Sequence, residues 1–69
     1  MLKKSVIIAK RHYTSISIEP EFWEEFERIA NKESVSTNDL ITKIDAQRGE
    51  NNLSSAIRVF VLQRLKTSR

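Results

Sequence analysis

The sequence predicts an α+β fold in which a short β-strand region is followed by three α-helices, all within one domain of residues 1–69. Three observations lead to this prediction. Residues 13–18 alternate between apolar and polar side chains, as a half-buried strand does. Three later segments repeat apolar residues at helical spacing, with residues typical of helix ends beside them. A chain of 69 residues has room for only one core.

The strand region is predicted over residues 5–18. Side chains alternate across a strand, so Thr14, Ile16 and Ile18 share one face while Tyr13, Ser15 and Ser17 share the other. We expect the isoleucine face to be buried and the serine face to be exposed. A single short strand is unstable in water without a partner strand, and a second copy of the chain is the first candidate for that partner.

The apolar run Val6–Ala9 has two alternative placements. It either extends the same strand or folds back on it as a hairpin, although no Gly or Asn in the segment favours a two-residue turn. A straight strand from Lys4 to Ile18 would be on the order of 45 to 50 Å long at about 3.3 Å per residue. That length is too great for so small a domain, so the hairpin is favoured.

The first two helices are predicted over residues 20–33 and 37–48. Pro20 suits the first position of a helix, where its missing N–H is no loss. Ser36, followed three residues later by Asp39, resembles a capping box at the start of the second helix. Gly49, the only glycine, suits the end of that helix. The apolar stripes of the two helices consist of Phe22, Trp23, Phe26, Ile29 and Ala30, and of Leu40, Ile41 and Ile44.

The third helix is predicted over residues 53–66. Its apolar residues recur over three turns, so one face should be buried against the rest of the domain or against a partner. This predicted face consists of Leu53, Ala56, Ile57, Phe60, Val61 and Leu65.

The basic residues gather near the N-terminus. The chain has 12 Lys and Arg against 9 Asp and Glu, a net charge of +3 and a pI near 9.6, which is compatible with an anionic partner. Residues 1–18 contain no acid, whereas residues 19–33 contain six glutamates. The glutamates fit a solvated helix face better than paired catalytic carboxylates. The basic residues of the N-terminal region are Lys3, Lys4, Lys10 and Arg11.

Several classes of protein do not fit this sequence. There is no cysteine, and a single histidine cannot form a metal site alone. No glycine-rich phosphate loop or nucleophile motif is present, so we expect neither an enzyme nor a bound cofactor or metal. The longest apolar run, Val6–Ala9, is too short for a membrane span or a signal peptide. We therefore expect a cytoplasmic protein without a membrane partner.

Two segments resemble a known family. The junction Ser17–Trp23, with the sequence Ser-Ile-Glu-Pro-Glu-Phe-Trp, and the segment Leu53–Arg58, with the sequence Leu-Ser-Ser-Ala-Ile-Arg, are similar to a bacterial branch of the ribbon-helix-helix superfamily. The resemblance covers roughly residues 10–65. The third helix is an addition, because the minimal fold of the superfamily ends after the second helix.

This resemblance implies an intertwined homodimer that binds double-stranded DNA. Two strands pair antiparallel into a ribbon that enters the major groove, while the helices form a shared core. The base contacts implied for this chain are Arg11, Tyr13, Ser15 and Ser17. The phosphate contacts are Lys3, Lys4 and Lys10 with Ser36, Thr37 and Asn38 at the second helix N-terminus, where a capping role is equally compatible. The implied dimer core comprises Ile16, Ile18, Phe22, Trp23, Phe26, Ile29, Leu40, Ile41 and Ile44.

The function predicted from these observations is that of a small transcriptional regulator, a repressor that occupies an operator as a homodimer. Two alternatives stay open. The first alternative is an antitoxin-type autorepressor. The second is a protein interaction module without a DNA role, which contacts its partner through the helix Leu53–Leu65.

Overall fold

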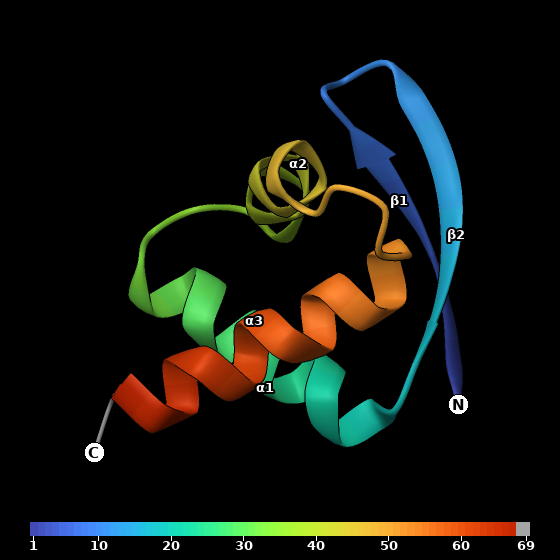
Figure 1. The fold of residues 1–69 in the computed structure, drawn as a ribbon. Coiled ribbons are helices and arrows are strands. Elements are labelled where there is room, and N and C mark those ends of the chain that lie inside the picture. Colours follow the sequence, from blue (N-terminus) through green and yellow to red (C-terminus); the bar gives the residue numbers. More distant parts are fainter. Residues whose placement is uncertain (68–69) are drawn as a thin grey trace.

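The structure is a computed structural model that describes residues 1–67. Figure 1 shows a β-hairpin with all three helices packed on the same side of it. The predicted α+β class and the order of a strand region followed by three helices are confirmed. Within the described residues, no helix is long and apolar enough to cross a membrane. The elements are β1 (Leu2–Ile8), β2 (His12–Ile18), α1 (Pro20–Lys32), α2 (Thr37–Gln47) and α3 (Leu53–Thr67).

The partner strand of β2 is β1 of the same chain. The two strands pair antiparallel from Leu2 opposite Ile18 to Ile8 opposite His12. The hairpin that the length argument favoured is therefore present, and the expectation that a second copy supplies the partner strand is wrong for this structure. The strand region also begins at Leu2, earlier than residue 5, because the side chain of Leu2 packs against the core.

The hairpin turn lacks the residues that usually mark such a turn. Ala9 and Lys10 both have positive φ, 55° and 59°, and the N–H of Arg11 donates to the carbonyl of Ile8 at 3.1 Å. Two consecutive left-handed residues are the signature of a type I′ turn, in which Asn and Gly are preferred. The turn is held instead by the neighbouring helix, since the N–H of Ala9 donates to Oγ1 of Thr42 in α2 at 2.9 Å.

The core lies between the inner face of the hairpin and the helices. Ile16 and Ile18 are buried while Ser15 is exposed, so the predicted strand faces are correct. Phe26, at the centre of the core, contacts Trp23 and Phe60 with ring centroids 5.5 and 6.0 Å away. One chain thus encloses the residues that the resemblance assigned to a core shared by two copies. They are buried except for Phe22 and Ile29, which are half-buried against the core.

The helix ends follow local rules. Oγ of Ser36 accepts the N–H of Asp39 at 3.0 Å, which is the cap predicted for α2. Gly49 has a φ of 62°, as expected for the residue that follows a helix C-cap. After α1, Ser34 adopts φ 58° and the N–H of Val35 donates to the carbonyl of Ala30 at 3.0 Å, which is a Schellman motif.

The third helix is apolar on more than one side. Leu53, Ala56, Ile57 and Val61 are buried, as predicted, and Phe60 is half-buried. Leu65 is different, because 43% of it is exposed. It belongs to the C-terminal part of α3, which is directed away from the hairpin (Figure 1).

An aspartate introduced on the buried face of β2 should unfold the protein, whereas one on the exposed face should not. Ile16→Asp should unfold the protein, because a carboxylate would replace a side chain that is only 3% exposed. Its thermal melt should therefore show no cooperative transition. Ser15→Asp, one residue earlier on the exposed face, should retain the fold. Circular dichroism melts of both variants test this. A normal melt for Ile16→Asp would mean that the strand faces are reversed.

Candidate nucleic-acid interface

The outer face of the hairpin is the surface that the helices leave uncovered. Three pairs of opposed residues form it, Lys3 with Ser17, Ser5 with Ser15, and Ile7 with Tyr13. Lys3, Ser5, Tyr13 and Ser15 are exposed, and Tyr13 is 79% exposed. Ser17 is half-buried, so of the three predicted base-contact residues on β2 it is the least accessible.

This outer face is basic. Lys10 and Arg11 are exposed in the turn at one end of it, and Lys3 lies near the other end. No Asp or Glu occurs among residues 1–18, so no acid on either strand opposes these cations. The face therefore offers positive charge, hydroxyl groups and one phenol over a length of about 20 Å at 3.3 Å per residue. That combination suits the phosphates and base edges of DNA.

Lys4 does not belong to this surface. It pairs with Ile16, so its side chain starts from the inner face, and its ammonium lies over the ring of Trp23 at 5.2 Å from the centroid. A lysine in this position contributes a cation–π contact and apolar packing of its methylene groups. The structure thus separates Lys4 from Lys3 and Lys10, with which the sequence analysis grouped it.

The N-terminal end of α2 is attached to the free edge of β1. The N–H of Ile7 donates to Oδ1 of Asn38 at 3.3 Å, and the N–H of Ala9 donates to Oγ1 of Thr42 at 2.9 Å. Thr42 in turn donates to the carbonyl of Asn38 at 2.9 Å. These bonds fix where the first turn of α2 lies relative to the outer face of the hairpin.

A hollow of about 290 Å³ lies beside this attachment. It brings together three predicted phosphate contacts, Lys10, Ser36 and Asn38, whereas Thr37 does not line it. The first N–H groups of a helix have no intrahelical partner, and the helix dipole makes that end positive. Asp39 also lines the hollow and offsets the charge of Lys10. The first N–H groups of α2 that the Ser36 cap does not bond can add to any attraction for an anion here.

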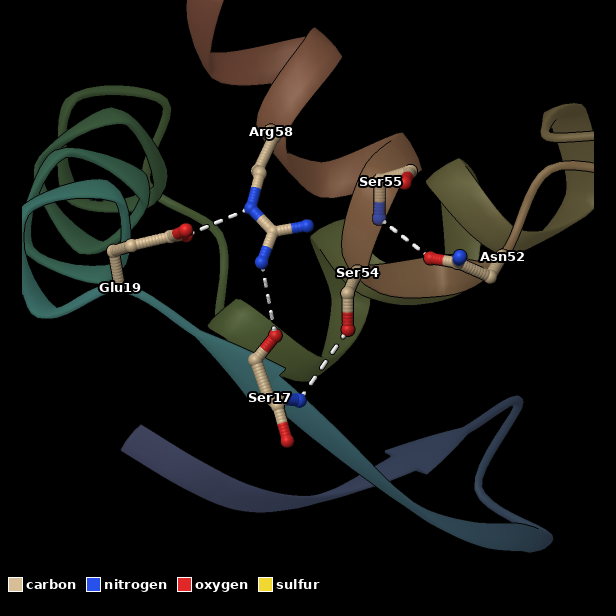
Figure 2. Close-up of polar contacts among 6 residues, drawn as sticks. All are labelled: Ser17, Glu19, Asn52, Ser54, Ser55 and Arg58. Carbon is tan, nitrogen blue, oxygen red and sulfur yellow. Dashed lines mark hydrogen bonds and ion pairs between the residues drawn. The ribbon is translucent and has the colours of Figure 1, made fainter. Parts of the chain in front are cut away.

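The N-terminal end of α3 is attached to the opposite edge, that of β2 (Figure 2). The N–H of Ser17 donates to Oγ of Ser54 at 3.3 Å, and Nη2 of Arg58 donates to the carbonyl of Ser17 at 3.4 Å. Nε of Arg58 also donates to Oε1 of Glu19 at 2.7 Å. Asn52 caps α3 by accepting the N–H of Ser55 at 2.8 Å.

Arg58 is thus a positioning residue that holds the end of β2 and the start of α1 against α3. Its guanidinium lies between Glu19 and the carbonyl of Ser17 (Figure 2). The hydrogen bond from Arg58 lowers the pKa of the Glu19 carboxyl below its ordinary value of 4.5, and a backbone hydrogen bond of Glu19 adds to the effect. The ionised form of Glu19 is therefore favoured in the folded protein.

Sequence reasoning missed some residues of this surface. Ser5 and Ile7 are alternate residues of β1 that lie on the same face as Lys3. Knowledge of the hairpin register is enough to place them on the outer face. Ser54 and Arg58 lie in the segment quoted for the resemblance, but their contacts with Ser17 cross 37 and 41 residues. Nothing local in the sequence indicates contacts of that range.

The ion pair predicts a specific pH dependence. The Glu19 pKa is lowered in the folded state, so its contribution to stability is complete above 4.5, where the unfolded carboxyl is also ionised. This contribution is lost as the pH falls through the lower folded pKa. Glu19→Gln should therefore melt below the wild type at neutral pH and converge with it on acidification. Thermal melts across the acid range test this, with Glu24→Gln on the exposed side of α1 as the control, and a constant gap at every pH would contradict it.

The comparison with known families agrees with this architecture. The family described as the ribbon-helix-helix domain matches residues 1–65, which include both strands, the turn, α1 and α2. No curated protein and no solved structure gives a significant match. Domains of this family typically bind DNA as transcription regulators, and they generally form homodimers. Because the match extends over nearly the whole chain, the protein belongs to the ribbon-helix-helix domain family.

Proposed function

We propose that the protein is a small transcriptional repressor that binds its operator as a homodimer and inserts the hairpin of β1 and β2 into the major groove. The observation that carries this proposal is the outer face of the hairpin, which is uncovered by helices and free of carboxylates. Membership of a family that typically binds DNA supports it. The protein would act in the cytoplasm, where its operator lies.

The dimensions of the hairpin suit the groove. Neighbouring strands lie about 4.8 Å apart, and the major groove is about 12 Å wide, so two strands with their outward side chains fill it. The side chains of Arg11 and Tyr13 would then contact base edges. An arginine can donate two hydrogen bonds to a guanine, and this is the most specific contact that this surface offers. Ser15 can bond to several bases and adds less discrimination.

Phosphate contacts would fix the orientation of the hairpin. Lys3 and Lys10 lie near opposite ends of the outer face, and the hollow beside α2 places Ser36 and Asn38 next to one edge. A DNA backbone that borders the groove would pass this edge, where the helix N–H groups point outward. Each phosphate neutralised by a Lys or Arg should add about −0.9 to the slope of log K against log salt. Binding is therefore expected to weaken steeply with salt.

Repression would follow from occupancy of the operator. A two-fold symmetric homodimer places its two copies on two half-sites related by the same symmetry, and a promoter covered in this way excludes the polymerase. The upstream region of the protein's own gene is the first operator to test, because small repressors of this type can regulate themselves.

The exposed apolar side chains of α3 favour a second function. Val59 and Leu62 are each 50% exposed, and an exposed apolar patch is a feature of protein interaction sites. An interaction module without a DNA role would use this helix alone. A folded protein that does not bind duplex DNA even at low salt would favour the interaction module over the repressor.

Removal of two exposed side chains should separate sequence preference from general binding. In Arg11→Ala/Tyr13→Ala, we expect the preference for the upstream region over random duplex to fall by roughly tenfold or more, since one good base contact contributes about 1–3 kcal/mol. The fold should persist because both residues are exposed. Fluorescence anisotropy titrations at two salt concentrations measure this.

Lys32→Ala is the matched control for this variant. It removes a positive charge from the last turn of α1, outside the hairpin, and should leave the preference between the two DNA duplexes unchanged. An Arg11→Ala/Tyr13→Ala protein that retains the full wild-type preference would exclude base contact by this end of the hairpin.

A further inference from the structure

We propose that two copies of the chain associate through the side formed by α1 and α3, with each copy retaining its own hairpin. This inference rests on the homodimer of the proposed function and specifies its interface. It differs from a dimer in which each copy donates one strand to a common ribbon.

Both edges of the hairpin are already occupied at several points. The inner edges of β1 and β2 pair with each other over seven residues of each strand. On the outer edge of β1, the N–H groups of Ile7 and Ala9 donate to α2. On the outer edge of β2, the N–H and the carbonyl of Ser17 are bonded to α3. A strand from a second copy that paired along the whole of either edge would have to displace these bonds, which disfavours strand pairing as the route to the dimer.

The outward side of α3 has apolar side chains that the single chain does not bury. Among residues 1–67, the large hydrophobic residues that are exposed number five, and three of them are on this helix. They are Val59, Leu62 and Leu65, which are 50%, 50% and 43% exposed. Exposed apolar side chains that gather on one surface are a feature of protein interaction sites. The outward side of α3 therefore offers a surface for a partner.

A hollow between α1 and α3 lies next to these residues. It has a volume of about 210 Å³ and is lined by Phe22, Val61 and Leu65, with Glu21 and Glu25 beside them. The apolar lining suits an apolar side chain, and the two glutamates favour a cation at the rim. An occupant should thus be a helix with an apolar residue and a basic residue on one side.

The outward side of α3 itself meets this requirement. Leu62 and Lys66 are exposed and lie four residues apart, so they point to the same side of the helix. Leu62 of one copy could fill the hollow of the other while Lys66 approaches Glu21. The hollow and the Leu62 ridge are adjacent on one surface, so a two-fold axis lets each copy contribute both parts. Charge complementarity therefore identifies the occupant as a second copy of this chain.

The location of this interface is compatible with DNA binding. A stable interface buries about 800 Å² per partner, which is roughly a sixth of the 5026 Å² surface of the chain. An area of this size must include α1 as well as α3. The C-terminal half of α3 lies far from the hairpin, and the outer face of the hairpin points away from all three helices (Figure 1). A dimer formed here would leave two outer faces open for two half-sites.

Sedimentation of the full chain over a range of concentrations tests the interface. We expect the wild type to form a dimer and Leu62→Lys to raise the dimer dissociation constant by at least about tenfold, since a buried apolar anchor would be replaced by a charge. Asn31→Lys adds the same charge on the opposite side of α1 from Phe22, outside the proposed interface, and should leave the dimer intact. Circular dichroism confirms that the variants are folded. A wild type that is monomeric throughout, or a Leu62→Lys protein that dimerises normally, would overturn the inference.

A charge exchange provides the second test. Glu21→Lys and Lys66→Glu should each weaken the dimer, and the double variant should recover the wild-type dissociation constant, because each copy then has the reversed pair. Absence of recovery would show that these two residues do not meet. DNA titrations of the same proteins are independent of this result. A dimer that shows these charge effects but does not bind DNA would contradict the repressor function and still support the proposed interface.

Discussion

The burial of the inner face of the hairpin against the helices is the interaction on which the rest of the structure depends. A two-stranded hairpin is marginal in water by itself, and this one has a turn without Gly or Asn. Val6, Ile16 and Ile18 supply the apolar face that makes it stable, and Phe26 and Ile57 are among the buried residues that complete the core with them. Side chains from α2 and α3 then hydrogen-bond to the two outer edges. The hairpin is thereby held in one orientation by α2 and α3.

This arrangement explains why the opposite face is available for a ligand. All the apolar cover lies on one side, so the outer face has only the polar and basic residues of the alternating pattern, with Ile7 as the exception. The same bonds that stabilise the hairpin also place the first turn of α2 beside it. Stability and the candidate DNA surface are therefore two consequences of the same packing. A change in Asn38 or Arg58 would be expected to affect both.

Much of this fold follows from sequence patterns that act locally. The period of two in residues 13–18 determines which side chains of β2 are buried, and helical periodicity locates the three helices. Ser36 and Gly49 mark the two ends of α2 because capping and positive φ are properties of single residues. The family resemblance quoted from two segments agrees with the match over residues 1–65.

What sequence patterns could not supply is the pairing of distant residues. The hairpin has no turn signal, because Ala9 and Lys10 adopt positive φ where Asn and Gly are usual. Without the register, Lys4 could not be assigned to the inner face, where it lies over Trp23. The contact between Glu19 and Arg58 crosses 39 residues. The exposure of Leu65 depends on how α3 packs beside α1, and periodicity does not contain that information.

An engineered disulfide between Ser5 and Ser15 shows whether one chain forms the whole ribbon. The two residues are opposed, exposed and on the outer face. The N–H groups of Ile7 and Ser17 point to the outer edges, so Ser5 and Ser15, which have the same parity, form a pair without mutual backbone hydrogen bonds. The Cα atoms of such a pair lie about 4.5 Å apart, within the range that a disulfide accepts. The chain has no cysteine of its own, so oxidation of Ser5→Cys/Ser15→Cys gives one bridge. A product that migrates as a single chain on a non-reducing denaturing gel and lacks free thiols is the predicted result. A covalent dimer, formed in preference even at high dilution, would show that the strands pair between copies.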